Sequence, residues 1–131
     1  MRVPRWPDVL AAKVEEWRAR PLEFGTTDCC QFCADVVLAL TGTDHRPSFP
    51  AYTSREEAET ILVSLGDMVG LLSSVLGESK PVAKAMRGDV VAADFGDGLA
   101  AGICLGVHCC APGPKGLLFL PTAYAVAAWS V

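Results

Sequence analysis

The sequence lacks the features that mark nucleic-acid-binding, membrane-spanning and secreted proteins. Its 131 residues contain no block of Lys and Arg and carry a net charge of −4, so we expect no nucleic-acid partner. No apolar run approaches the roughly 20 residues that cross a bilayer, so no membrane span is expected. The opening residues, MRVPRWPDV, lack the apolar core of a signal peptide. We therefore expect synthesis and folding in the cytosol, where thiols stay reduced.

Other absences narrow the chemistry. The chain has no Gly-rich phosphate loop, no serine elbow, no internal repeat and no low-complexity segment. Histidine is scarce, with only His45 and His108 available as imidazole bases. Hydrophobic residues are abundant and make up 51% of the sequence. Such a composition predicts a globular chain, part of whose surface is covered by a partner.

The first half of the chain predicts four helices. The first begins near Pro7, and the second follows a cap at Thr27 or Asp28 and ends near Gly42. The capping box 54-SREE-57 begins the third helix. A short fourth helix contains Met68, Leu71, Leu72 and Val75.

The second half predicts strands. The segment 88-GDVVAA-93 and the segment 99-LAAGICLG-106 flank the hairpin turn 96-GDG-98. Further short strands are expected around 107-VHCCA-111, 116-GLLFLP-121 and 127-AAWSV-131. Helices followed by strands predict one α+β domain over residues 1–131, with N-terminal helices packed on a small, mainly antiparallel sheet.

Six cysteines are the most distinctive chemical groups, and three of them lie in 26-TTDCCQFCAD-35. Cys29 is expected at the first turn of the second helix, where unpaired N–H groups and the helix dipole stabilise a thiolate. A thiol in that position becomes a nucleophile when an imidazole is near. The simpler interpretation is that cysteines on an apolar helix pack as small hydrophobic side chains.

A metal site is the third interpretation of the cysteines. Thiolates in this number suit zinc or an iron–sulfur cluster. The spacing is unlike that of paired zinc-ribbon motifs, and adjacent cysteines on a strand point to opposite faces of the sheet. No cofactor is therefore expected, with a zinc or iron–sulfur site as the alternative; its candidate ligands are Cys30, Cys33, Cys109 and Cys110.

Three motifs follow one another along the chain: 24-FGTTDC-29, 88-GDVV-91 and 102-GICLG-106. Their order resembles the NlpC/P60 branch of papain-like cysteine peptidases. In that branch a segment like WG…DCSG opens the nucleophile helix, a GD strand follows, and a strand reading HVGIYLG comes next. The resemblance covers the chain from about residue 22 to its last residue and implies a papain-like domain.

The whole chain is similar to small phage and prophage proteins of the same superfamily, whose genes lie among tail genes. That group shares an N-terminal Trp/Arg helix and a helix that opens with DC. Its further motifs occur here as 41-TGTD-44, 88-GDVV-91, 111-APGPKGLLFLP-121 and 128-AWSV-131. The similarity implies a protein of the phage tail.

The resemblance places Cys29 at the nucleophile position, but Ala100 stands where the family has its base histidine. The third, orienting residue of the family falls near Cys110. His108 can replace the missing base only if its side chain reaches the same cleft as Cys29, because a base must lie within hydrogen-bond reach of the proton that it takes.

Two hypotheses follow from these residues. In the first, the chain is a structural protein of a phage or prophage-derived tail tip or baseplate, assembled in the host cytoplasm and located in the virion. An inactive papain-like domain, a pseudoenzyme, then docks on tail hub proteins near the tape-measure protein, with Trp6 and Trp129 as expected exposed docking residues. In the second, the chain is a cysteine hydrolase of cell-wall peptides that acts during genome delivery, with Cys29 as nucleophile and His108 as base.

Overall fold

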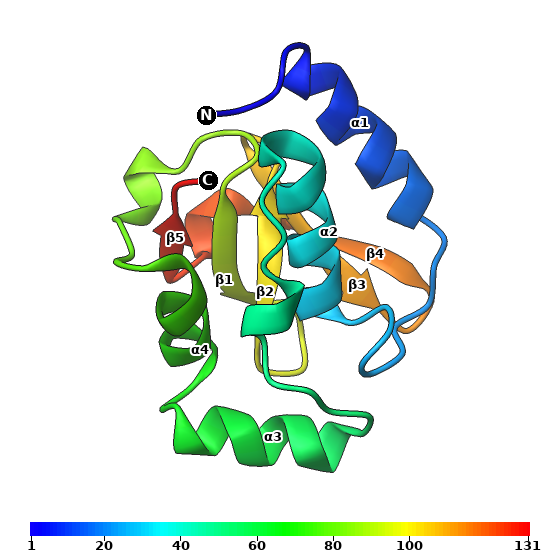
Figure 1. The fold of residues 1–131 in the computed structure, drawn as a ribbon, viewed down its shortest axis with the longest axis vertical. Coiled ribbons are helices and arrows are strands. Elements are labelled where there is room, and N and C mark those ends of the chain that lie inside the picture. The colour runs from blue at the N-terminus through cyan, green and yellow to red at the C-terminus, as the bar shows by residue number, and fades with distance from the viewer.

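A computed structural model describes residues 1–131 and places four helices around a five-stranded sheet (Figure 1). The helices are α1 (Trp6–Trp17), α2 (Cys29–Thr41), α3 (Arg55–Ser64) and α4 (Met68–Leu76). The strands are β1 (Val90–Asp94), β2 (Leu99–Cys104), β3 (His108–Gly113), β4 (Gly116–Pro121) and β5 (Ala127–Trp129). Short 3₁₀ helices occupy Arg46–Ser48 (η1), Val82–Lys84 (η2) and Thr122–Tyr124 (η3).

The strands lie in the order β4-β3-β2-β1-β5, and every neighbouring pair is antiparallel. Three tight turns join β1 to β4 as successive neighbours, whereas β5 crosses to the far edge and pairs with β1. The predicted α+β class, with helices before strands and an antiparallel sheet, is therefore confirmed.

Helix α2 forms the centre of the core because it packs across the sheet, with α1 covering its outer side (Figure 1). Its side chains Phe32, Val36 and Leu40 are fully buried. Phe32 meets the ring of Trp17 from α1 edge-on at 5.2 Å. The indole nitrogen of Trp17 in turn donates to Asp35 at 2.8 Å. Burial of this apolar face supplies most of the stability of the helix layer.

The predicted cap of α2 is confirmed at one of its two candidates. Asp28 accepts the backbone N–H of Gln31 at 3.0 Å and that of Gly25 at 2.5 Å. Thr27 instead donates its hydroxyl to the carbonyl of Pro21 at 2.6 Å. The helix ends at Gly42, whose φ of 80° is the left-handed conformation typical of a C-terminal glycine.

The expectation that Trp129 is exposed is wrong. Its side chain is fully buried, and its indole nitrogen donates to the carbonyl of Gly77 at 3.1 Å. The reason is the return of β5 to the sheet, where Trp129 lies opposite Val90. Trp6, by contrast, is half-buried under the guanidinium of Arg2, 4.3 Å from the ring centre.

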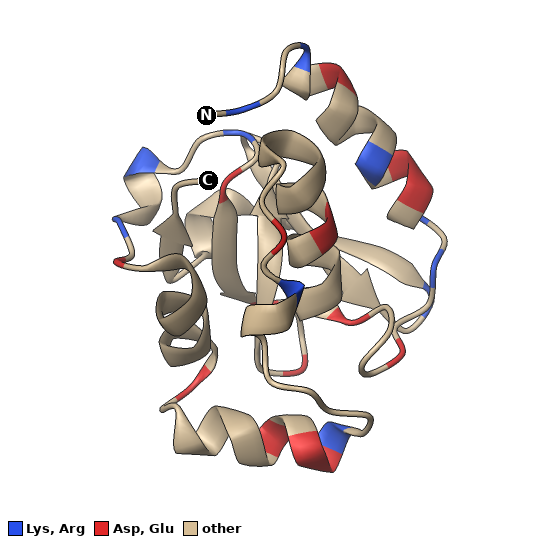
Figure 2. Cartoon of the chain, viewed as in Figure 1, with Lys and Arg blue, Asp and Glu red and all other residues tan.

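Charged side chains gather on the helices and loops, and Asp94 is the one charged residue within the five strands (Figure 2). No single helix is long and apolar enough to cross a membrane. Only α3 and α4 taken as a pair reach the required length and composition, and a bend of 74° separates them.

Candidate functional site

A cleft opens beside the first turn of α2 and encloses about 320 Å³. Of the 22 residues that line it, 14 are hydrophobic. The lining residues come from the loop before α2, from α3 and α4, from the β1–β2 turn and from strands β2, β3 and β4. The hydrophobic ones include Leu22, Phe24, Ala58, Ile61, Leu62, Met68, Leu71, Phe95, Leu99, Ala100 and Leu118. The volume and apolar character are those of a small-molecule or peptide side-chain pocket.

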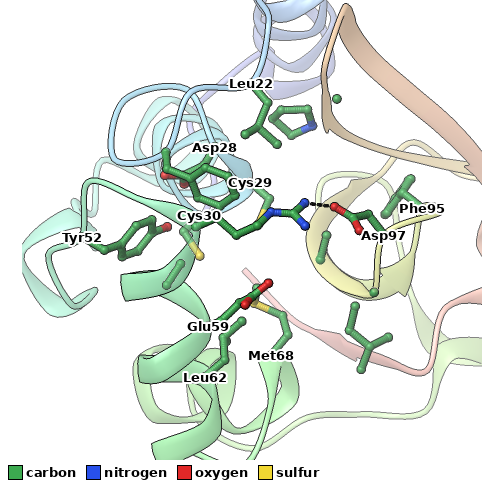
Figure 3. A pocket seen from close by; sticks show the side chains of 18 of the residues that line it. Leu22, Asp28, Cys29, Cys30, Tyr52, Glu59, Leu62, Met68, Phe95 and Asp97 are labelled. Atoms are coloured by element: carbon green, nitrogen blue, oxygen red, sulfur yellow. Dashed lines mark hydrogen bonds and ion pairs between the residues drawn. The ribbon is translucent and has the colours of Figure 1, made fainter.

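Cys29 lies in this cleft as the first residue of α2, and its side chain is half-buried (Figure 3). The thiol of Cys30 and the backbone N–H groups of Ala101 and Cys30 are the polar donors near its sulfur. These donors lower the pKa of the Cys29 thiol, although burial and the nearby Asp28 carboxylate oppose them. The arrangement favours the thiolate, which is the nucleophilic form.

The sheet provides one of these donors because β2 and β3 separate early. The two strands pair only at Ile103–Cys110 and Cys104–Cys109. Ala101 lies beyond the last of these pairs, and its N–H is near the sulfur of Cys29. The divergence of β3 thus makes room for the first turn of α2 against β2.

Cys30 and Tyr52 lie behind Cys29 in the cleft. Interaction with Cys29 and burial raise the pKa of Cys30 well above its usual value, and burial raises the pKa of Tyr52. Both groups therefore remain protonated near the Cys29 sulfur.

Charged groups stand at the mouth of the cleft. Arg55, at the start of α3, forms an ion pair with Asp97 of the β1–β2 turn, the contact that ends on Asp97 in Figure 3. The guanidinium also lies 6.0 Å from the ring centre of Phe24. Glu59 follows one turn later on α3 and lines the same cleft. The ion pair connects α3 to the sheet across the opening.

Neither histidine lines the cleft. His108 is exposed at the start of β3, where its carbonyl accepts the N–H of Leu105, beyond the end of β2. Ala100, which takes the place of the family's base histidine, lies near the opposite end of that strand and does line the cleft. His45 precedes η1, beyond the C-terminal end of α2. The structure thus brings Cys29 and Ala100 together and leaves His108 outside.

Cys110, near which the resemblance places an orienting residue, belongs to the core under α2. Burial raises the pKa of its thiol to about 12. It does not line the cleft and cannot orient a base there.

The four candidate metal ligands do not share one face of the sheet. Cys30, Cys33 and Cys110 lie in the main core, whereas Cys109 lies in the smaller cluster on the other face of the sheet, as the alternation of strand side chains predicts. Burial raises the pKa of Cys33 well above its usual value and that of Cys109 to about 11. No group of three or more His, Cys, Asp or Glu side chains is arranged to hold a metal ion, so the zinc and iron–sulfur alternatives have no ligand set among these residues.

Four polar residues of the site were not predicted as functional: Tyr52, Arg55, Glu59 and Asp97. Each has a local explanation in the sequence that conceals its place in the cleft. Tyr52 lies in an irregular loop, Arg55 and Glu59 follow a capping box, and Asp97 forms a turn. Only the packing of α3 against the β1–β2 turn brings them together.

Comparison with known proteins gives one family. The model of the DUF6950 family, described as a domain of unknown function, matches residues 1–131, and the chain therefore belongs to that family. No curated protein matches the chain.

Proposed function

We propose that this member of the DUF6950 family is a structural component of a phage or prophage-derived tail tip or baseplate. In this proposal an NlpC/P60-type, papain-like domain serves as an assembly module that docks on tail hub proteins. It is assembled in the host cytoplasm and resides in the virion. The domain retains the thiol position of a peptidase without hydrolysing peptide bonds.

The arrangement of Cys29 supports the papain-like interpretation. The residue begins a helix that packs across an antiparallel sheet, and its sulfur meets the backbone of β2 at Ala101. Cys29 of the motif 24-FGTTDC-29 thus lies beside Ala101, the residue that precedes 102-GICLG-106, and this proximity supports the resemblance to the NlpC/P60 branch.

The observation that carries the non-hydrolytic proposal is the absence of an imidazole from a cleft that holds the thiol. Amide hydrolysis requires a group that takes the nucleophile's proton and later gives a proton to the leaving amine, and imidazole does both near neutral pH. The carboxylate of Asp28, next to Cys29, does not replace the imidazole, because both of its oxygens accept hydrogen bonds from backbone N–H groups.

Exposed apolar side chains near η3 offer a docking surface. Tyr124 is 69% exposed and Val126 is 58% exposed. Val107, in the β2–β3 turn, is joined to the same region by the hydrogen bond from the N–H of Thr122 to its carbonyl, at 2.8 Å. We define these three residues, Val107, Tyr124 and Val126, as the η3 patch.

The proposal is tested by expressing the chain with its neighbouring tail genes, purifying the particles and detecting the chain by immunoblot. We expect it in the particles, and we expect Tyr124→Asp with Val126→Asp to reduce its incorporation. Val63→Asp, at an 80% exposed position on α3, is the matched control and should leave incorporation unchanged. Particles that form normally and contain no chain would contradict the proposal.

One observation favours the hydrolase as a second candidate: the lowered pKa of Cys29 at the start of a helix. The assay is release of soluble peptides from cell-wall material. Release above that of a Cys29→Ala variant would establish the hydrolase and exclude the inactive module. We expect no difference between the two proteins.

A further inference from the structure

Cys104 and Cys109 are two thiols that neither the papain-like interpretation nor the docking proposal uses. They lie directly opposite each other on the neighbouring antiparallel strands β2 and β3. Both are free thiols, and both belong to the smaller buried cluster, on the sheet face opposite the main core. Two cysteines that share a face at one register position have their side chains directed alongside each other, which a disulfide requires.

The backbone hydrogen bonds of Cys104 show how close the two strands come at this pair. Its N–H donates to the carbonyl of Asp89 at 2.8 Å, and its carbonyl accepts the N–H of Gly88 at 2.8 Å. Both groups therefore point toward the β1 side and leave no bond to Cys109. In such a non-hydrogen-bonded pair the Cα atoms lie about 4.5 Å apart. Disulfides span Cα separations of about 4.4–6.8 Å, so the bond can form with little movement of the backbone.

We propose that Cys104 and Cys109 form a cross-strand disulfide in an oxidising medium, with hydrogen peroxide as the oxidant. The thiolate of one cysteine attacks a peroxide oxygen, the O–O bond breaks, and a sulfenic acid and a hydroxide form. The thiolate of the other cysteine attacks that sulfur, forms the S–S bond and expels a second hydroxide. The two hydroxides take up the two thiol protons and become water. The cysteines lose two electrons, and the peroxide gains them.

The cover over the pair explains why a small oxidant is required. The hydroxyl oxygen of Thr122, the first residue of η3, lies 4.0 Å from the sulfur of Cys104. The same hydroxyl donates to the carbonyl of Gly106 at 2.7 Å. The N–H of Gly106 lies 3.4 Å from the Cys104 sulfur, and its carbonyl lies 3.5 Å from it. Local opening of the three-residue η3 therefore exposes the sulfur while α2 and the sheet remain folded.

The neighbouring Cys110 does not compete for Cys104. It lies opposite Ile103 and belongs to the main core on the other face of the sheet. Adjacent residues of a strand point to opposite faces, so Cys110 points away from Cys104. Cys110 is thus the matched control for Cys109.

The proposed function would bring the pair into both redox environments. Thiols stay reduced in the host cytoplasm, whereas a released particle meets an oxidising medium. The disulfide would then tie β2 to β3 directly beside the turn that carries Val107 of the η3 patch. This step from reduced to oxidised chain rests on the proposed function, but the geometry of the pair does not.

The experiment treats the purified full chain with hydrogen peroxide, then denatures it and alkylates the remaining thiols. Cys29→Ala is treated in parallel, because the half-buried Cys29 also consumes peroxide. In Cys29→Ala, intact mass should show two alkyl groups fewer than in the reduced protein. Chymotrypsin cleaves after Leu105, between the two cysteines, and the two fragments should stay joined until a reductant is added.

The disulfide should also raise the thermal stability and respond to pH. Closing so short a loop should raise Tm by up to about 8 °C, and a reductant should reverse the rise. Burial raises the pKa of the Cys109 thiol to about 11, so its thiolate is scarce at neutral pH. Disulfide formation should therefore be slow at pH 7 and faster at pH 9.

Three variants assign the bond. Cys104→Ala and Cys109→Ala should each lose both the joined fragments and the rise in Tm on oxidation. Cys110→Ala should keep both. The rise is measured against the reduced form of the same variant, so a loss of core packing in Cys110→Ala does not affect it.

Two results with the purified chain would each overturn the inference: peroxide treatment that leaves both thiols open to alkylation, and joined fragments that persist in Cys109→Ala. A third measurement separates it from the docking proposal. Thiols are blocked at lysis, and the redox state is compared between cytoplasmic and particle-bound chain. We expect reduced and oxidised protein, respectively. A reduced chain in purified particles would overturn the disulfide and leave the docking proposal intact, whereas disulfide formation by a chain that no particle contains would support the disulfide and contradict docking.

Discussion

Removing the buried carboxylate of Asp89 should cost the fold much of its stability. Asp89 is 2% exposed and accepts hydrogen bonds from Arg2 at 3.0 Å and Lys80 at 2.7 Å. It also accepts the backbone N–H of Met86 at 2.8 Å and that of Val131 at 3.3 Å. The aspartate of the GDVV motif thus joins both ends of the chain to the sheet.

The size of the loss follows from what Asp89→Ala leaves unpaired. Breaking a buried ion pair costs about 3–5 kcal/mol, and each buried N–H without a partner about 1–3 kcal/mol. The side chains of Arg2 and Lys80 are 15% and 21% exposed, so water recovers part of this cost. We expect the free energy of unfolding to fall by about 3 kcal/mol, which lowers Tm by about 10 °C in a chain of this size.

Urea and thermal unfolding followed by circular dichroism measure this loss. Asp89→Asn keeps one acceptor oxygen and should lose less than Asp89→Ala. Asp8→Ala, which breaks an exposed pair with Arg5, is the matched control and should not change stability measurably. If Asp89→Ala lost no more than Asp8→Ala, the network around Asp89 would not stabilise the fold and the reasoning would be refuted.

Three further changes test the site and the core. The rate of Cys29 alkylation should rise with pH as the thiolate forms, and the midpoint of this rise should lie below that of a free cysteine. Cys30→Ala should raise the midpoint, because it removes the Cys30 thiol, the main group that lowers the pKa of Cys29. Cys30→Ser should raise the midpoint less, because it keeps a hydroxyl donor. Gly25→Ala should lower the free energy of unfolding by about 2 kcal/mol. Gly25 has φ of 86°, and an added Cβ would collide with the backbone carbonyl of Tyr52. An unchanged urea midpoint would contradict this expectation. Phe32→Ala removes a fully buried ring between α1 and α2 and should cost about 3–5 kcal/mol, measured by urea unfolding.

Local signals in the sequence were sufficient to predict the helices and strands. Asp28 and Gly42 mark the two ends of α2, and the Gly-Asp-Gly turn separates β1 from β2. These features predict well because each depends on the conformation of a few adjacent residues.

Long-range contacts account for what the sequence did not reveal. Trp129, the third residue from the end of the sequence, was expected to be exposed, yet β5 returns across the sheet and buries it. Tyr52, Arg55 and Asp97 meet around Cys29 only after the loop, α3 and the β1–β2 turn have packed together. A motif in the sequence predicted Cys29 as a site residue. Whether His108 reaches Cys29 depends on the directions of β2 and β3, which the sequence did not reveal.

Helix α3 carries no fully buried residue, and Figure 1 shows it at the edge of the molecule, away from the sheet. Elements with so little buried surface open locally at a free energy well below that of global unfolding. Its backbone amides should therefore exchange with solvent deuterium before those of α2 and the central strands. Because α3 forms one wall of the cleft, each such opening enlarges the space beside Cys29. The largest ligand that the cleft admits is then set by the opening equilibrium of α3, and it grows with temperature while the sheet remains folded.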